Sequence, residues 1–149
     1  MIAVVQRVLE AKVTVDGQVV GQIAHGLAVL VAVHRDDTAA DAHWMAGKLV
    51  GLRIFRQGDK HFDADVRQAG GAILLVSNFT VAGQTRRGRR PSLEAAAGPE
   101  RGQTLFDQLV REVSALGVPT ATGRFGADMQ VLLVNDGPVT FIVDSRAGQ

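Results

Sequence analysis

The sequence is organised around two apolar runs near its carboxyl end, joined by a short polar segment. Met129–Val134 and Val139–Val143 are rich in Val, Leu and Ile, which favour an extended backbone. Between them lies Asn135-Asp-Gly-Pro138, in which Asn, Asp and Gly tolerate turn dihedral angles and the proline has no amide hydrogen to give to a sheet. The stretch therefore predicts a strand, a turn and a second strand.

A second apolar run ends in the same way. Ile73–Val76 is continuously apolar, and it is followed directly by the polar side chains of Ser77 and Asn78, then by Phe79 and Thr80. Two strands that both end in small polar groups predict a pocket near those ends.

The remaining pattern places strands and two helices along the chain. Strands are predicted at 2–8, 11–15, 18–23, 27–33, 53–55, 72–76 and 118–122. The run 27–33 has no polar residue, which predicts a central strand covered on both faces. Apolar residues at helical spacing predict helices at 39–52 and 100–116, whereas 61–68 is polar and fits neither pattern. The fold class predicted is mixed α/β (α+β), with two long helices packed on a largely antiparallel or mixed sheet.

Composition narrows the class of protein. A length of 149 residues with 46% hydrophobic content predicts one domain spanning 1–149, with a disordered tail at 145–149. The formal net charge is only +1, so a polyanion has to be met by a local basic patch. The chain has no cysteine and no apolar run of about 18 residues, so we expect a soluble cytoplasmic protein that does not enter a membrane.

The common catalytic motifs are missing from the sequence. The four histidines lack the spacing of a zinc protease, and no nucleophile elbow, phosphate-binding loop or dinucleotide-binding motif occurs, so we expect neither metal nor cofactor. The hydroxyls of Ser77 and Thr80 are poor nucleophiles without a base beside them. Ser77 and Asn78 can donate hydrogen bonds to a carbonyl or to the oxyanion that it becomes, although ordinary turn hydrogen bonding explains them equally well.

Between these stretches lies a basic segment, Gln84–Ser92, which contains four arginines: Arg86, Arg87, Arg89 and Arg90. Guanidinium groups match phosphate oxygens in a forked geometry, so the segment is either a phosphodiester contact or a solvated loop. The aromatic content of 5% is too low for a stacking platform along a single strand, but Phe79 and Phe125 can each stack on one base.

The two polar motifs carry a family resemblance. Ser77-Asn-Phe-Thr80 resembles the Ser-Gln-Phe-Thr motif of the D-aminoacyl-tRNA deacylases (the D-tyrosyl-tRNA deacylase family), and Asn135-Asp-Gly-Pro-Val-Thr140 resembles their Asn-x-Gly-Pro-Val-Thr motif. Shorter similar pieces occur along almost the whole chain: Gln6-Arg7-Val8, Gln68-Ala-Gly-Gly71, Gly88-Arg-Arg-Pro-Ser92 and Gly123-Arg-Phe-Gly-Ala-Asp-Met129.

The resemblance implies a function and a set of site residues. It implies a homodimer with active sites at its interface, which hydrolyses the ester of a D-amino acid, or of glycine, on the terminal adenosine of tRNA as a step of translation quality control. The catalytic group is then Ser77, Asn78, Phe79 and Thr80, and the substrate-binding group is Arg7, Phe125, Met129, Gly137 and Pro138. The four arginines of 84–92 contact the tRNA. No side-chain nucleophile is required, because the 2′-hydroxyl of the tRNA assists.

The resemblance also implies a cis peptide bond between Gly137 and Pro138, whose carbonyls enter the partner's pocket and exclude L-amino acids. One position departs from the family pattern: Asn78 stands where the family usually has Gln, so its side chain is one methylene shorter. Two alternatives stay open on the residues alone. One is a non-catalytic module that binds RNA or the end of tRNA, and the other is an interaction protein whose apolar strands form a dimer.

Overall fold

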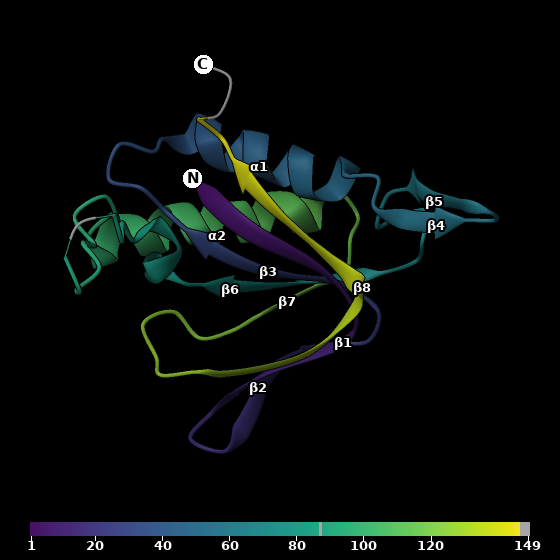
Figure 1. Ribbon diagram of the computed structural model, residues 1–149, viewed down its shortest axis with the longest axis horizontal. Coiled ribbons are helices and arrows are strands. Elements are labelled where there is room, and N and C mark those ends of the chain that lie inside the picture. The colour runs from purple at the N-terminus through teal and green to yellow at the C-terminus, as the bar shows by residue number, and fades with distance from the viewer. Residues whose placement is uncertain (87, 147–149) are drawn as a thin grey trace.

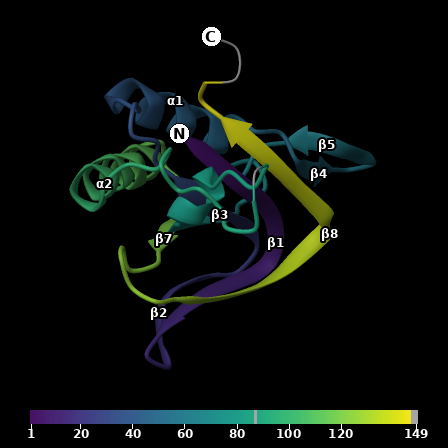
Figure 2. The same ribbon diagram turned by 60° about the vertical axis from the view of Figure 1, so that its left-hand side comes forward.

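The computed structural model describes residues 1–86 and 88–146 and shows a mixed sheet with helices on one side (Figures 1 and 2). The strands of this sheet are β1 (Ile2–Val15), β2 (Gln18–Ile23), β3 (Gly26–Ala32), β6 (Ala72–Ser77), β7 (Thr120–Thr122) and β8 (Gln130–Asp144). Their order is β2-β1-β3-β6-β7, with β8 paired to β1. β3, β6 and β7 run parallel to one another, and the other pairs are antiparallel, as the predicted fold class requires.

Two helices, α1 (Ala39–Gly51) and α2 (Pro99–Ala115), cover one face of the sheet. The backbone N–H of Thr38 bonds to Asp41 in a capping box at the start of α1, and Pro99 occupies the first turn of α2, where it loses no helical hydrogen bond. Both helices begin and end within one residue of the predicted positions. Their buried apolar faces form one core with the facing side of the sheet.

The opposite face of the central strands is covered by other strands of the same sheet, which curls over it. The carboxyl half of β1 and the amino half of β8, together with β2, curl around and pack on β3 and β6 (Figure 2). Ala28 lies in this second core, whereas Leu27 and Val29 lie in the first. The prediction of a central strand that is buried on both faces is therefore confirmed for β3.

The predicted strand–turn–strand at 129–143 is wrong in one respect, because the chain does not reverse. β8 runs antiparallel to β1 on both sides of the polar segment. Asn135 pairs with Val8 and Thr140 pairs with Gln6, so five steps along β8 match two along β1 and three residues are extra. These residues bulge from the strand, since the residue types that suit a turn suit a bulge equally well.

A small hairpin projects from the body of the protein (Figures 1 and 2). It consists of β4 (Phe55–Gln57) and β5 (Lys60–Ala64), which pair only with each other. The predicted strand at 53–55 lies two residues too early, and the start of the unassigned segment 61–68 forms β5. The polar composition that hid this hairpin follows from its exposure, since 56–62 faces solvent on both sides.

The predicted disordered tail begins too early. Ser145 is buried; its hydroxyl accepts a hydrogen bond from the amino group of Met1 at 2.7 Å and donates one to Asp41, also at 2.7 Å. The same amino group forms an ion pair with Asp37 at 2.5 Å. The two chain ends are thus tied together beside α1, and the prediction for 147–149 lies outside the described residues.

Candidate functional site

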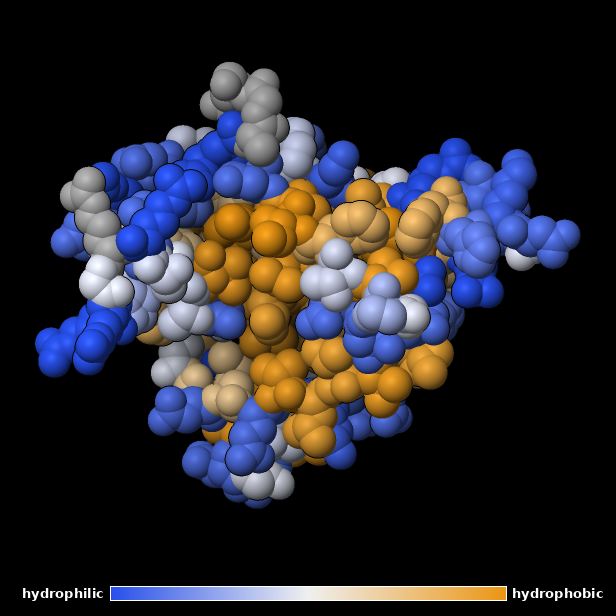
Figure 3. Space-filling model, viewed as in Figure 1, coloured by the Kyte–Doolittle hydropathy of each residue, from blue (hydrophilic) through white to orange (hydrophobic). Residues whose placement is uncertain are grey.

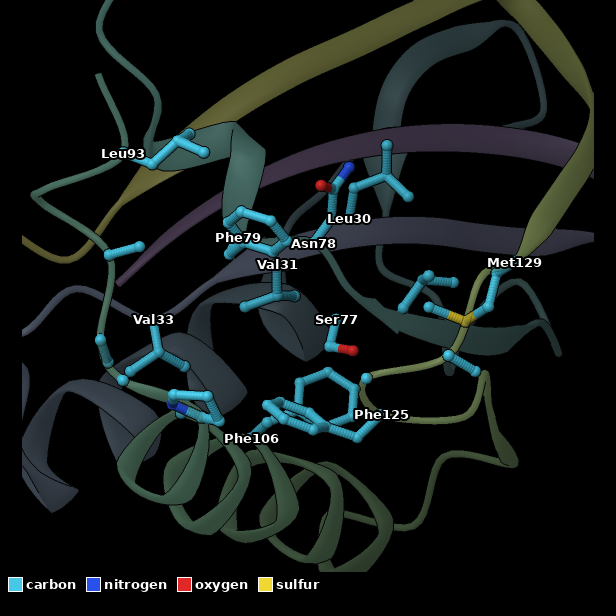
Figure 4. Close-up of a pocket in the computed structure, with 18 of the residues that line it drawn as sticks. Leu30, Val31, Val33, Ser77, Asn78, Phe79, Leu93, Phe106, Phe125 and Met129 are labelled. Atoms are coloured by element: carbon cyan, nitrogen blue, oxygen red, sulfur yellow. The ribbon is translucent and has the colours of Figure 1, made fainter. Parts of the chain in front are cut away.

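A cavity of about 860 Å³ opens at the carboxyl ends of the parallel strands (Figure 4). Its walls are the end of β3, the end of β6, the segment that follows β7 and the start of α2. In sheets with parallel strands, ligands bind outside these carboxyl ends, where the chain leaves the sheet and frees backbone groups. The predicted pocket is present, and Ser77, Asn78 and Phe79 line it as expected.

The polar motif forms the wall at the end of β6. The backbone N–H of Asn78 still bonds to Val31 O at 2.8 Å, which extends the β3–β6 pairing by one residue. The chain then enters a single 3-10 turn, η1 (Phe79–Ala82). Ser77 points toward the space lined by Phe125 and Met129, while Phe79, which is 58% exposed, stands at the mouth of the cavity (Figure 4).

Thr80 does not point its hydroxyl at a base. Its Oγ1 donates to Asn78 Oδ1 at 2.5 Å, and its backbone N–H donates to the same oxygen at 3.2 Å. Thr80 is exposed and, unlike its three neighbours, is absent from the cavity lining. The polar motif offers neutral hydrogen-bonding groups to a ligand, and the side chains that line the cavity in the described part of the chain include one carboxylate, Asp128, but no histidine, lysine or arginine.

Apolar side chains form the far wall. Phe125 and Phe106 lie with their ring centroids 6.2 Å apart, and the Met129 side chain reaches in from the start of β8 (Figure 4). Met129 packs against the backbone of Gly123, where an added Cβ would stand 2.5 Å from Met129 Sδ. A glycine at 123 is thus what lets the thioether lie along this wall.

The second polar motif forms a rigid turn elsewhere on β8. The Asn135 amide donates to Arg7 O and to Val139 O at 3.0 Å each, and its Oδ1 accepts the N–H of Val139 at 3.2 Å. Three hydrogen bonds from one side chain therefore close the base of the bulge. The peptide bond between Gly137 and Pro138 is cis, as predicted, and both residues are exposed.

Arg7 holds the other side of the bulge. It is only 4% exposed, and its Nε pairs with Asp136 Oδ2 at 2.9 Å while its Nη1 donates to Ile54 O at 2.7 Å. The ion pair is partly screened because the Asp136 side chain is 44% exposed. Arg7 thus supports the turn from behind and reaches neither the cavity nor solvent.

Gly137 and Pro138 do not line the cavity of their own chain. They are exposed on β8, as are large apolar side chains of the same strand such as Ile142 at 72%, and Phe62 on β5 is 56% exposed. Figure 3 shows that apolar residues gather on one face of the molecule. Phe62 meets Phe141 edge to face, with ring centroids 6.2 Å apart. Within one chain, the structure brings five of the predicted site residues to the cavity and leaves the Gly137–Pro138 turn apart from them; the five are Ser77, Asn78, Phe79, Phe125 and Met129.

The basic segment follows η1 directly. Gln84 and Ser92 exchange two backbone hydrogen bonds of 2.9 Å, which close 85–91 into a loop beside the cavity mouth. Arg86, Arg89 and Arg90 are exposed on it, and the prediction for Arg87 lies outside the described residues. Leu93, just after the loop, lines the cavity.

Sequence patterns missed the wall contributed by α2. Ala96, Ala97, Gly98 and Gly102 line the cavity together with Phe106. Small residues that precede a helix carry no chemical signature, so only the closeness of α2 to the strand ends reveals them. The hydrogen-bonding role of Asn135 was also missed, although its motif was recognised.

The fold and the cavity describe a small α/β protein with a largely apolar pocket at the carboxyl ends of its parallel strands. A family model described as D-Tyr-tRNA(Tyr) deacylase matches residues 4–144. The chain therefore belongs to the D-Tyr-tRNA(Tyr) deacylase family, as its motifs predict. The D-aminoacyl-tRNA deacylase of Geobacter sulfurreducens is 52% identical over 147 residues, covering 99% of this chain and 97% of that protein. That of Pelobacter propionicus is 51% identical over 144 residues, covering 97% and 99%.

Two solved structures have the same fold. One, titled c-Myc DNA Unwinding Element Binding Protein, superposes with a TM-score of 0.91 at 34% identity and covers 97% of this chain and 98% of that one. The other, a probable eukaryotic D-amino acid tRNA deacylase, gives a TM-score of 0.80 at 18% identity over 95% of this chain and 97% of that one. No helix among the described residues is long and apolar enough to cross a membrane.

Proposed function

We propose that this protein hydrolyses the ester of D-aminoacyl-tRNA, and of glycine mischarged on tRNA, releasing the free amino acid and the tRNA. The observation that carries the proposal is the match of the family over nearly the whole chain, together with a cavity at the Ser77–Phe79 motif. In the reaction, water adds to the ester carbonyl, and the bond from that carbon to the ribose oxygen breaks.

The chemistry fits a site without a side-chain nucleophile. Ser77 lies beside no histidine in the described lining, and the Thr80 hydroxyl is already committed to Asn78. An unactivated hydroxyl is a weak nucleophile at neutral pH. We infer that the 2′-hydroxyl of the terminal ribose assists the water, while the Ser77 hydroxyl donates to the developing oxyanion.

Chirality is selected, in this proposal, by the Gly137–Pro138 turn of a second copy. The turn is exposed, is anchored by Arg7 and Asn135, and does not reach its own cavity. Placed in the partner's cavity, its backbone carbonyls would occupy the space of an L side chain and leave a D side chain free. Rejection by backbone sterics accepts many different D side chains, because it reads only the configuration at Cα.

The second copy would be recruited by the apolar face that surrounds the turn. Leu132, Val134, Phe141 and Ile142 on β8 are each 40% exposed or more, Phe141 contacts Phe62, and apolar residues gather on the face of the molecule shown in Figure 3. A contiguous apolar surface of this kind is a typical protein–protein interface. A homodimer that covers it brings each turn to the neighbouring copy.

The tRNA would be held by the arginine loop. Its arginines are exposed, and the loop lies between η1 and Leu93, which lines the cavity that the single-stranded end of tRNA has to enter. Phosphate contacts from arginine bind all tRNAs alike, whatever the amino acid. Binding and chiral selection are thus assigned to different parts of the molecule.

Incubation with D-Tyr-tRNA and L-Tyr-tRNA tests the proposal. We expect ester loss above the no-protein control for the D-ester only, and a strongly reduced rate on a D-ester of tRNA ending in 2′-deoxyadenosine. Equal loss of both enantiomers would refute the chiral mechanism. Binding of charged tRNA without release of amino acid would instead favour the non-catalytic RNA-binding module.

A further inference from the structure

Asn78 is the one residue of the polar motif that departs from the family pattern, and its side chain is already engaged within its own chain. Its Oδ1 accepts two hydrogen bonds from Thr80, one from the backbone N–H at 3.2 Å and one from the hydroxyl at 2.5 Å. The same residue is the amino-terminal cap of η1 and has an extended backbone (φ −148°, ψ 91°). Both donors come from the residue two positions ahead.

We propose that Asn78 is a positioning residue, which acts on the reaction by fixing η1 and not by contact of its amide with the substrate. A bond from a side-chain oxygen to the backbone N–H two residues on is typical of Asn and Asp, whose short side chains mimic a backbone turn. Both bonds keep the Asn78 oxygen within its own chain, at the start of η1.

The hydrogen bonds to Asn78 matter for η1 because the side chains of Phe79 and Thr80 are not held by packing. Phe79 is 58% exposed and Thr80 is exposed, so neither side chain is fixed by a surrounding core. Two backbone bonds join η1 to the residues that flank it: Val81 N–H to Asn78 O at 3.2 Å and Gly83 N–H to Thr80 O at 2.9 Å. The two bonds to Asn78 Oδ1 add to these at the start of the turn and help to set the position of Phe79 at the cavity.

Close contacts at Gly83 restrict the other end of η1. A Cβ added to Gly83 would stand 2.8 Å from Thr80 O and 3.3 Å from a methyl carbon of Leu93. The turn is thus fixed at its end by Gly83 and at its start by Asn78. A geometric error at the start moves Phe79 relative to Ser77, which lines the same cavity.

Two substitutions at position 78 separate positioning from substrate contact. Asn78→Ala removes both the acceptor oxygen and the amide donor, whereas Asn78→Ser removes the amide but keeps an oxygen that caps a helix well. With D-Tyr-tRNA as substrate, we expect Asn78→Ala to lower kcat about tenfold with little change in KM, and Asn78→Ser to recover most of that loss. A serine variant as slow as the alanine variant would overturn the inference.

A double-mutant cycle with Thr80→Val gives an independent readout. This substitution removes only the hydroxyl that donates to Asn78 Oδ1. If Asn78 acts through Thr80, the double variant is no slower than Asn78→Ala alone, because the broken bond is the same. Losses in kcat that multiply would show that Asn78 acts on the substrate directly.

The inference rests on the proposed deacylase function. Different results would refute the function and the role of Asn78. Wild-type protein that releases no D-tyrosine would refute the function itself. Active wild-type protein with additive losses, or without rescue by serine, would overturn only the role of Asn78. Thermal unfolding of each variant confirms that the kcat differences arise in folded protein.

Discussion

Removal of the Asn135 side chain should loosen the Gly137–Pro138 turn and measurably destabilise the fold. Asn135→Ala deletes three hydrogen bonds, to Arg7 O, Val139 O and the N–H of Val139, at 3.0 to 3.2 Å. At about 1 kcal/mol for each hydrogen bond, the free energy of unfolding should fall by about 3 kcal/mol. Val139 is only 8% exposed, so water does not readily replace the lost partners.

Urea unfolding, extrapolated to zero denaturant, measures this loss. Gln130→Ala on the same strand is the matched control, since its one side-chain contact with Thr14 is exposed and long at 3.3 Å; we expect it to change stability by less than about 0.5 kcal/mol. Asn135→Asp keeps the acceptor for Val139 N–H but turns a carboxylate toward two carbonyl oxygens, so it should be no more stable than Asn135→Ala. A loss below about 0.5 kcal/mol in Asn135→Ala would refute the idea that this side chain holds the turn.

Further predictions concern the cavity, the loop, the hydroxyl and a buried histidine. Gly123→Ala should displace Met129, whose Sδ lies 2.5 Å from the new Cβ, and raise KM for D-Tyr-tRNA, whereas Gly47→Ala, which meets no atom within 4 Å, should leave KM unchanged. Replacing Arg86 and Arg89 with Ala should reduce the salt dependence of tRNA binding by about two phosphate contacts while kcat changes little; an unchanged slope would make the loop merely solvated. Thr80→Ala should keep substantial activity, and trapping a covalent aminoacyl ester on Thr80 would contradict this. Burial, and then the nearby Arg146, lower the pKa of His34 below 6.5, so the unfolded chain binds a proton that the folded one does not. Stability should therefore fall as the pH drops below about 6.5, by up to about 1.4 kcal/mol per pH unit, and His34→Gln should flatten that slope in pH-dependent unfolding.

Local patterns were sufficient for the helices and for the central strand. The two helices followed from apolar residues at helical spacing, and β3 followed from an unbroken apolar run. These signals are local, because each depends on the residues of one element only. The hairpin at 55–64 was missed since strands exposed on both faces show no apolar alternation.

The sequence predicted the cavity motif but not the bulge in β8, for a physical reason. The Ser77–Thr80 motif pointed to the cavity, but the bulge in β8 depends on register against β1, a distant strand whose pairing no local pattern encodes. The same holds for Arg7, whose sequence neighbours say nothing of its contacts with Asp136 and Ile54. The two hydrogen bonds from Thr80 to Asn78 Oδ1 likewise became visible only with the fold of η1.

A mixed dimer tests most directly the claim that the turn of one copy completes the cavity of another. Ala127→Trp fills the cavity from its lining, and Gly137→Ala distorts the turn, since φ at 137 is +148° and an added Cβ would stand 2.6 Å from Val139 Cγ2. The two variants are co-expressed with different carboxyl-terminal tags, because the amino group of Met1 is buried, and are purified through both tags.

Each variant alone should be nearly inactive on D-Tyr-tRNA. In the mixed dimer, one site combines two altered halves and the other combines an intact cavity with an intact turn. The account therefore predicts about half of the wild-type activity per dimer. A mixed dimer as inactive as its parents would contradict it, and so would purification through both tags that yields no mixed species.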